Sequence, residues 1–360
     1  MLANDNLKAR LIAYYLPQYH PIPENDEWWG KGFTEWTNVA KARPLFRGHY
    51  QPRLPGELGF YDLRVPETRE TQAQLAREHG IEGFCYWHYW LGGGKILLQR
   101  PFEEVLASGK PDFPFCLGWA NHSWTGIWFG APDKTLCEQT YPGLEDHLAH
   151  FDYLLKAFKD PRYITVEGKP LLHIFRPYEI PNIKSVMDLW RELALENGLT
   201  GLYIVGEGIT PLQVDSFGLD GLTYSRHRHI AEIKIPKYNI QRRFLSWYRK
   251  TFRKPAHYLY KDAMKYFFRD KLSASNHFPS IITNWDSTPR LGWQGVVLKG
   301  VTPNLFRAHV RKIIQAVSHK DKEHRLIFVK SWNEWAEGNY LEPDQRYGRA
   351  FLEVLRDEML

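Results

Sequence analysis

Residues 326–342, LIFVKSWNEWAEGNYLE, begin as a buried strand and end in a cluster of charged and aromatic side chains. The first four residues, LIFV, form the β-branched and aromatic run that is typical of a buried strand. Glu334 and Glu337 then stand among tryptophans. Indole faces pack on sugar rings, and two carboxylates can divide acid, base and nucleophile roles at a glycosidic carbon. The stretch therefore predicts a strand that leads into a sugar site.

Seven more strand-like runs precede this one. We expect strands at residues 10–17, 81–90, 115–119, 170–175, 202–206, 221–224, 280–284 and 326–329. Helical patterns separate them, at residues 65–79, 102–108, 144–158, 183–197, 241–272, 303–317 and 347–357. Alternating strands and helices favour a parallel α/β sheet, and eight strands favour closure as a (β/α)8 TIM barrel. An open doubly wound sheet is the alternative, but no glycine-rich phosphate loop follows the first strand.

We see no internal repeat, low-complexity tract or linker, so we expect residues 1–360 to form a single (β/α)8 barrel domain. The first strand is followed by a segment of more than 40 residues without sustained periodicity, residues 17–62. Loops of this length in a compact domain are usually functional. We therefore expect a long first βα loop that borders the active site.

Composition narrows the function class. Aromatic residues make up 15% of the chain, and many tryptophans stand beside Asn, His or Glu, which suits carbohydrate or nucleic-acid bases. The formal charge of +6 is mild, so we expect no nucleic-acid partner. The cysteines, Cys85, Cys116 and Cys137, form no metal or redox motif. We expect neither a cofactor nor a metal ion.

The first 17 residues lack the apolar core and small-residue cleavage site of a signal peptide. No stretch of about 20 apolar residues is present to span a bilayer. We therefore expect a cytoplasmic protein. One segment of the sequence also raises the alternative of a peripheral location at a membrane. The oligomeric state is left open by the sequence.

That segment is residues 241–269, QRRFLSWYRKTFRKPAHYLYKDAMKYFFR, which interleaves Arg and Lys with Phe, Tyr and Trp. One interpretation is a helix that packs on the barrel while its cationic side chains reach water. The second is a peripheral membrane patch for anionic lipid, which would suit a lipid-linked glycan as substrate. Stacking on bases is a third option that no nucleic-acid motif supports.

In a TIM barrel the active site lies where the strands end, so polar and aromatic side chains should follow the strands. They do so here, whereas the opposite strand ends carry no comparable set. Our candidate sugar contacts are Tyr15, Trp87, His88, Asn121, Trp124, Tyr224, His229, Trp285, Trp332 and Asn333. Our candidate catalytic residues are Glu334 and Glu337.

Less specific interpretations stand beside these. Trp87 and His88 could pack at the barrel rim, and Glu207, after the fifth strand, could pair with a neighbouring arginine. His227 and His229 alternate like a metal-binding pair on a strand, but no third ligand is obvious. Glu334 and Glu337 could be solvated charges on a final turn.

Several motifs resemble known proteins. SWNEWAEGNYLEP, residues 331–343, resembles the Glu-Trp-x-Glu signature of glycoside hydrolase family 99. AYYLPQYH, GFCYWHYW and WANHSW resemble WbsX-type, family-99-like proteins of polysaccharide biosynthesis loci. The resemblance runs from about residue 10 to residue 342, and it implies the same barrel.

The resemblance to family 99 also implies a reaction. It is hydrolysis within α-mannosyl chains with retention of configuration and without a metal. Carried over by position, Glu334 would act as base on the sugar 2-hydroxyl, giving a 1,2-anhydro intermediate. Glu337 would be the general acid/base. The run GLDGLTY resembles a family motif and makes Tyr224 and His229 candidate sugar contacts.

The proposed chemistry places a demand on the backbone. Retaining glycosidases hold their two carboxyl groups about 5–5.5 Å apart. Residues i and i+3 of a straight strand lie about 10 Å apart and point to opposite faces. We therefore expect the chain to turn between Glu334 and Glu337, and Gly338 is consistent with such a turn.

Three functions follow from the sequence. The first is a retaining endo-type glycoside hydrolase acting on an α-linked oligo- or polysaccharide, mannan-like or from a bacterial surface. The second is a glycosyltransferase in lipopolysaccharide, O-antigen or capsule biosynthesis. Against it, we find no Asp-x-Asp metal site and no phosphate-cradling loop. The third is a catalytically silent glycan-binding barrel. The sugar and its linkage do not follow from the sequence.

Overall fold

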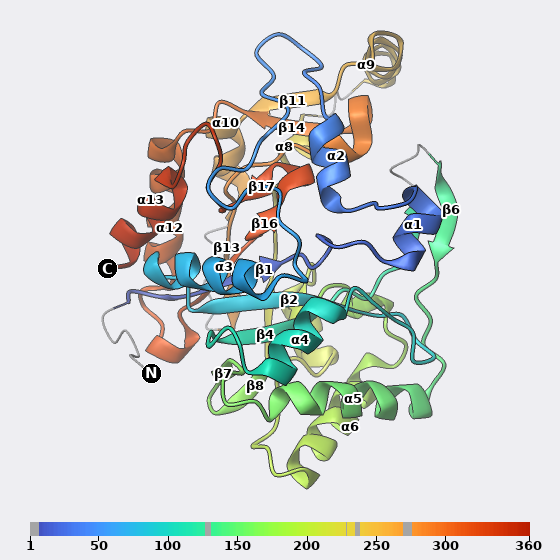
Figure 1. Ribbon diagram of the computed structural model, residues 1–360, viewed down its shortest axis with the longest axis vertical. Coiled ribbons are helices and arrows are strands. Elements are labelled where there is room, and N and C mark those ends of the chain that lie inside the picture. Colours follow the sequence, from blue (N-terminus) through green and yellow to red (C-terminus); the bar gives the residue numbers. More distant parts are fainter. Residues whose placement is uncertain (1–6, 127–130, 228, 235–237, 269–275) are drawn as a thin grey trace.

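The computed structural model describes residues 7–126, 131–227, 229–234, 238–268 and 276–360 (Figure 1). Its centre is a nearly closed barrel of nine parallel strand segments, which confirms the predicted fold class. Around the barrel the strands are hydrogen-bonded in the order β12-β10-β9-β8-β4-β2-β1-β15-β13. Their bounds are β1 Arg10–Tyr15, β2 Gly83–Trp90, β4 Phe115–Trp119, β8 Lys169–Ile174, β9 Tyr203–Glu207, β10 Gly221–Thr223, β12 His277–Phe278, β13 Ser280–Ile281 and β15 Leu326–Val329.

The seventh strand position differs from the prediction, because it starts earlier and is divided at Pro279. Before the proline, β12 pairs with β10 through His277 and Leu222. After it, β13 pairs with β15 through Ser280 and Phe328. Proline has no N–H to donate to a strand ladder, so an interruption here is expected. Residues 277–281 thus connect both ends of the sheet and bring the barrel close to closure.

Successive side chains of each strand point alternately into the barrel and toward the helices. In β1, Tyr14 points inward and stacks on Trp87, with ring centres 4.7 Å apart, and on Phe328 at 5.3 Å. The next residue, Tyr15, points outward, and its hydroxyl donates to Gln72 of α3 (Pro66–Glu78) at 2.7 Å. This alternation decides which predicted site residues reach the interior.

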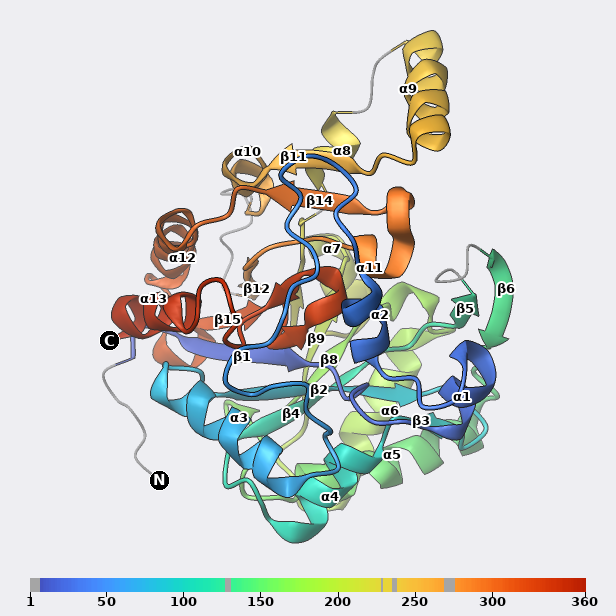
Figure 2. The ribbon, with the colours of Figure 1, turned by 45° about the horizontal axis from the view of Figure 1, so that its top comes forward.

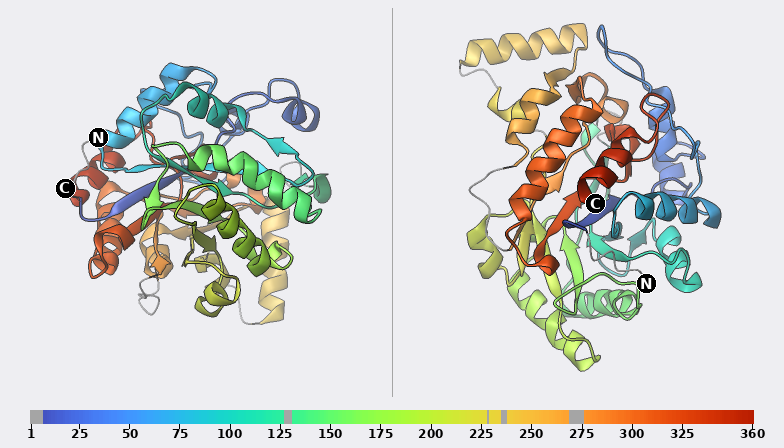
Figure 3. Two further views of the ribbon diagram at one scale, coloured as in Figure 1. Left: turned by 90° about the horizontal axis from the view of Figure 1, so that it is seen from below. Right: turned by 90° about the vertical axis from the view of Figure 1, so that its left-hand side faces the viewer.

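Helices cover the outside of the barrel (Figure 3). They are α3, α4 Arg100–Ser108, α5 Leu144–Phe158, α6 Ile183–Glu196, α7 Pro211–Ser216, α12 Pro303–Val317 and α13 Ala350–Met359. The predicted bounds of α5 and α12 are confirmed, and those of the other predicted helices in this set shift by one to three residues. The short strands β3 (Ile96–Leu97) and β7 (Thr165–Val166) pair with the barrel strands β2 and β8.

The long first loop contains two short helices, α1 (Pro23–Trp29) and α2 (Glu35–Lys41), which its irregular sequence did not predict. The buried carboxylate of Asp286, which follows β13, holds this loop in place. It accepts hydrogen bonds of 2.7 Å from His49 and Gln51 of the loop, and one of 2.6 Å from the Thr288 hydroxyl. The loop is thereby tied to the C-terminal end of the seventh strand.

The cationic aromatic segment is not one helix. It begins with α9 (Asn239–Phe252), continues into β11 (Ala256–Leu259), which pairs with β14 (Val296–Lys299), and then forms α10 (Tyr260–Ala263). None of the residues of α9 is buried, and Figure 2 shows this helix standing apart from the barrel. The interpretation that this part packs on the barrel is therefore wrong. Residues 269–272 lie outside the described residues. No described helix is both long enough and apolar enough to cross a membrane.

Candidate active site

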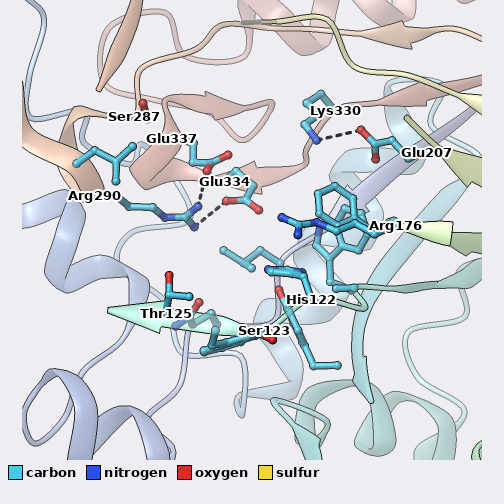
Figure 4. A pocket seen from close by; sticks show the side chains of 18 of the residues that line it. His122, Ser123, Thr125, Arg176, Glu207, Ser287, Arg290, Lys330, Glu334 and Glu337 are labelled. Carbon is cyan, nitrogen blue, oxygen red and sulfur yellow. Dashed lines mark hydrogen bonds and ion pairs between the residues drawn. The ribbon is translucent and has the colours of Figure 1, made fainter. Parts of the chain in front are cut away.

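A cavity of about 770 Å³ opens at the C-terminal ends of the barrel strands (Figure 4). Residues that follow several strands line it together with residues of the first loop. They include Leu16, Gln18, Trp29, Trp87, Tyr89, His122, Ser123, Trp124, Thr125, Phe175, Arg176, Glu179, Glu207, Trp285, Arg290, Lys330, Glu334 and Glu337. Five of the residues selected from sequence are in this set, namely Trp87, Trp124, Trp285, Glu334 and Glu337.

The chain bends between Glu334 and Glu337, as predicted. Glu334 ends the short strand β16 (Asn333–Glu334), and Glu337 ends a 3-10 turn over Trp335–Glu337. Gly338 then adopts a φ of 59°, and the chain returns as β17 (Asn339–Tyr340), paired antiparallel with β16. A Cβ atom on Gly338 would lie 2.7 Å from the Cβ of Asp286, so a side chain is excluded there. The turn brings both carboxylates into the cavity.

Both carboxylates contact one guanidinium, that of Arg290 on α11 (Thr288–Leu291) (Figure 4). Arg290 Nη2 lies 2.8 Å from Glu334 Oε2, and Nη1 lies 2.7 Å from Glu337 Oε1. The third nitrogen, Nε, donates to Glu35 of α2 at 2.7 Å. Glu35 is fully buried, so the first loop supplies a fixed carboxylate that positions the guanidinium of Arg290. Three chain segments distant in sequence thus converge on one charge cluster.

This cluster contains three carboxylates and one cation, which favours retention of a proton. Burial raises the pKa of Glu334 to about 7; Arg290 opposes the shift, while Glu337 and Glu35 add to it. Burial also raises the pKa of Glu35, again against the effect of Arg290. A carboxyl group that titrates near neutral pH is suited to general acid–base chemistry.

Aromatic side chains form the walls of the cavity. Trp87 lies flat against Tyr14 below it, and Trp124 meets Tyr89 edge to face with ring centres 5.2 Å apart. Trp124 belongs to β5 (Trp124–Gly126), which pairs with β6 (Ala131–Cys137) in a hairpin beside the cavity. The arrangement gives a sugar ring apolar faces on which to pack.

In these walls, the indole nitrogens of Trp124 and Trp285 have no hydrogen-bond partner among the described residues. Burial, with a smaller effect of Arg176, lowers the pKa of His122 to about 4, so its ring is neutral near pH 7. Buried polar groups ordinarily find partners. The two indole nitrogens are therefore suited to the hydroxyl groups of a bound sugar.

Two further cations line the cavity (Figure 4). Lys330 lies 3.7 Å from Glu207, so the expected partner of Glu207 is a lysine instead of an arginine. Arg176 pairs with Glu179 at 2.7 Å. Asn121 supports this arginine from behind, because its side chain accepts from the Arg176 backbone N–H and donates to the Arg176 carbonyl, both at 2.8 Å. Asn121 does not line the cavity and holds its wall instead.

Two predicted sugar contacts, His88 and Tyr15, point away from the cavity. Both occupy the outward phase of their strands, one residue away from the inward-pointing Trp87 and Tyr14. His88 is buried against α5, where its Nε2 lies 2.9 Å from His150 Nε2. Burial lowers the pKa of His88 to about 3. Direct sugar contact does not fit either position.

Trp332 and Asn333 precede the turn that carries Glu334 and Glu337, and both support it from within the protein. Asn333 is fully buried, and its side-chain amide accepts from the Leu16 N–H at 2.7 Å and donates to the Leu16 carbonyl at 3.0 Å. Trp332 is also fully buried and packs on Phe84, with ring centres 5.2 Å apart. These two residues join the last strand to β1 and β2 instead of facing a ligand.

Tyr224 and His229 also lie outside the set that lines the cavity. Tyr224 is buried directly after β10. His229 begins α8 (His229–Ile233), where its ring contacts Arg226 and its Nδ1 lies 2.8 Å from Glu232. Within the described ranges, no group of three or more His, Cys, Asp or Glu side chains is arranged to hold a metal ion.

The catalytic residues and sugar contacts selected from sequence did not include Arg290, Glu35, Tyr89 or His122, although Tyr89 and His122 stand among the polar and aromatic residues that follow the strands. Tyr89 could have been found, because it shares the phase of Trp87 two residues earlier in β2. His122 stands in the motif WANHSW beside the selected Asn121. Arg290 and Glu35 carried no signal, since they lie on short helices of irregular loops that only the folded chain brings together.

Comparison with known proteins agrees with this architecture. The model of the family described as glycosyltransferase WbsX matches residues 11–355. The protein WxcX of Xanthomonas campestris pv. campestris is 34% identical over 363 residues, covering 99% of this chain, and WxcX of a second strain is also 34% identical. The chain spans about half the length of these curated relatives.

Solved structures share the fold at low sequence identity. A GH99 endo-alpha-mannosidase from Bacteroides thetaiotaomicron, in complex with bis-tris-propane, has a TM-score of 0.59 at 14% identity. The alignment covers 97% of this chain and 95% of the mannosidase. A glycoside hydrolase-like protein has a TM-score of 0.57 at 17% identity, covering 98% and 94%. With a glycoside-hydrolase-like barrel and a family match along nearly its full length, the chain belongs to the WbsX family.

Proposed function

We propose that this protein is a retaining glycoside hydrolase that cuts within an α-linked polysaccharide. The observation that carries the proposal is the turn that brings Glu334 and Glu337 onto one guanidinium inside an aromatic-walled cavity. Trp87, Trp124 and Trp285 serve as sugar-packing surfaces in this proposal, and His122 and Tyr89 join them. The cavity volume of about 770 Å³ matches the size of ligand-binding clefts and accommodates more than one sugar ring.

In the first step Glu334, as a carboxylate, takes the proton of the sugar 2-hydroxyl. The freed oxygen attacks the anomeric carbon, and the glycosidic bond breaks as Glu337 protonates the leaving oxygen. In the second step Glu337 removes a proton from water, which opens the 1,2-anhydro ring, and Glu334 returns its proton to the 2-oxygen. Two displacements on one carbon give overall retention.

Arg290 has to change its hydrogen bonding during this cycle. A general acid donates its proton to the leaving oxygen, whereas in this structure Glu337 Oε1 lies 2.7 Å from Arg290 Nη1. Glu35 can keep the guanidinium in place through Nε while the contact with Glu337 lengthens. Sugar hydroxyl groups that enter between Arg290 and Glu337 would produce this change. Arg290 therefore acts as a positioning residue for the carboxylate pair.

The substrate class combines two sources. The solved neighbours include endo-alpha-mannosidases, which supports an α-linked chain cut at an internal position. Membership of the WbsX family supports a bacterial surface polysaccharide as the biological setting. We propose such a chain, mannan-like in linkage, as the substrate.

A glycosyltransferase is the second candidate, and the description of the family favours it. The same carboxylate pair could pass the sugar to an acceptor hydroxyl instead of to water. In that case Lys330 and Arg176 would have a use, because cations at the cavity wall suit the phosphates of an activated donor.

The test is to incubate the protein with α-mannan and with bacterial surface oligosaccharides, with and without nucleotide sugars, and to measure released sugar. We expect release without any nucleotide donor. Glu334→Gln and Glu337→Gln should each reduce turnover by roughly 10²–10⁴-fold. Glu82→Gln, which removes a carboxylate that pairs with Arg10 at the start of β1, is the matched control and should keep full turnover.

Each other outcome points elsewhere. Sugar transfer that requires a nucleotide donor would replace the hydrolase with the transferase. Oligosaccharide binding without turnover under either condition would make the chain a glycan-binding barrel. Unchanged turnover in both glutamate variants would overturn the assignment of the catalytic pair.

A further inference from the structure

Helix α9 divides its apolar and cationic residues between two faces. At 100° per residue, Ile240, Phe244, Trp247, Tyr248 and Phe252 fall on one side of the helix. The opposite side carries four cations and no acid, namely Arg242, Arg243, Arg249 and Lys250. This separation is typical of an amphipathic helix that contacts an apolar surface with one face and a polar environment with the other.

The apolar face is not used within this chain. The exposed fractions are 78% for Ile240, 64% for Phe244, 56% for Trp247, 41% for Tyr248 and 53% for Phe252. Along this face, Phe244 contacts Trp247 with ring centres 5.7 Å apart. Tyr248 likewise contacts Phe252, with ring centres 5.0 Å apart. Monomeric soluble proteins rarely expose a contiguous apolar patch of this kind unless it meets a partner.

The charge around α9 is of one sign. Between Glu232 and Asp262 the sequence contains no acidic residue. The same interval contains nine cations: Lys234, Lys237, Arg242, Arg243, Arg249, Lys250, Arg253, Lys254 and Lys261. This contrasts with the cavity, where Arg290 contacts three carboxylates of the chain itself. Because no acid stands near them in the sequence, Arg243, Arg249 and Lys250 are expected to find their counter-charge on another molecule.

We propose that α9 lies in the surface of an anionic lipid membrane. Its aromatic face enters the boundary between headgroups and acyl chains, and its cations reach lipid phosphates and carboxylates. Exposed aromatic and aliphatic side chains on one face with Arg and Lys on the other are what such a surface binds. A second copy of the chain is a poorer occupant, because it would bring two sets of like charges together.

The base of α9 is connected to the border of the active site. Lys254, just after the helix, donates from Nζ to the Leu45 carbonyl of the first loop at 2.8 Å. The chain then enters β11, which pairs with β14, and β14 follows the turn segment that carries Arg290. A membrane-bound α9 would hold the protein at the lipid surface through elements next to the cavity. This proposal does not depend on which reaction the cavity performs.

The test is sedimentation of the full chain with vesicles of phosphatidylcholine alone or of phosphatidylcholine with one third phosphatidylglycerol. We expect binding to the anionic vesicles only, weakening as NaCl is raised from about 0.1 to 0.5 M, because salt screens exposed charges. Arg243→Gln/Lys250→Gln should weaken binding by roughly fivefold for each cation removed. Phe244→Ser/Trp247→Ser should weaken it by about tenfold or more.

Leu212→Ser is the matched control, since Leu212 is 86% exposed on α7 and has no cationic face beside it; its binding should equal that of the wild type. Circular dichroism of each variant shows that the barrel is folded. The proposal is overturned if the wild type does not bind anionic vesicles, or if the α9 variants bind as well as the wild type. It is also overturned if Trp247→Ser dissociates a dimer that itself binds no vesicles.

Discussion

The cavity and helix α9 contain the same kinds of residue, arginine and aromatic side chains, in opposite environments. In the cavity, Arg290 is nearly buried and contacts three carboxylates. Trp87, Trp124 and Trp285 of the wall are buried. On α9 the aromatic residues are exposed and the interval from residue 233 to residue 261 has no acid. The cavity is electrostatically compensated from within, so it can hold a fixed geometry. Arg243, Arg249 and Lys250 of α9 have no acid near them in the sequence, which supports the proposal that this helix meets a charged partner surface.

The largest effect that we expect from this contrast is a loss of folding stability when Arg290 is replaced. Arg290→Met would leave buried carboxylates without their cation and should lower the free energy of unfolding by about 3–5 kcal/mol. Arg307→Met is the control, because Arg307 pairs with Asp357 and Glu358 between helices near the surface. It should cost less than about 1 kcal/mol. Urea denaturation measures both, and equal losses would contradict the distinction.

The second effect concerns Glu342, whose buried carboxyl accepts hydrogen bonds of 2.6 Å from Trp335 Nε1 and Gln72 and of 2.9 Å from Tyr61. Burial raises its pKa to about 7, although these hydrogen bonds oppose the shift. The folded protein therefore keeps a proton at pH values where the unfolded chain has lost it. The protonated Glu342 therefore contributes to the stability of the folded protein. This contribution is complete below about pH 4.5 and is lost as the pH rises through about 7.

Glu342→Gln removes the titration. The difference in unfolding free energy between wild type and variant should therefore change by up to about 3 kcal/mol between pH 4 and pH 8, with the wild type losing stability. Denaturation curves at intervals of pH measure this difference. Parallel pH profiles for the two proteins would show that Glu342 does not titrate in this range.

Strand β2, GFCYWHYW, illustrates how much of the site could be predicted from the sequence. The order of strands and the barrel could be predicted, because each strand is a distinct apolar run followed by polar residues. The facing of side chains could also have been predicted by applying the two-residue alternation with one phase, which selects Trp87 and Tyr89 and rejects His88. The pairing of Arg290 with Glu35 could not, since both lie on short helices of irregular loops, 255 positions apart.

The third effect is on the pH dependence of activity. Because burial raises the pKa of Glu334 to about 7, this carboxyl group is largely protonated in more acidic solution. Under the proposed mechanism, kcat/KM should rise roughly tenfold per pH unit below about pH 7 and level off above it. Steady-state rates on an α-linked oligosaccharide measure this. A profile that stays flat from about pH 5 to 8 would assign the base role to another group.

The smallest effect is expected on α9. Phe244→Ser/Trp247→Ser removes exposed side chains and should change the free energy of unfolding by less than about 0.5 kcal/mol. Trp124→Ser, which removes a buried indole from the cavity wall, should cost about 3 kcal/mol or more. Thermal or urea unfolding of both variants compares the two regions directly. A large loss for the α9 variant would mean that the helix stabilises the fold.

The stereochemistry of the product tests the central claim most directly. Proton NMR recorded during cleavage of an α-linked oligosaccharide, without a nucleotide donor, shows which anomer is released first. The proposed joint action of Glu334 and Glu337 predicts an initial α-anomer that later equilibrates in water. An initial β-anomer, or no release until a nucleotide sugar is added, would contradict the account.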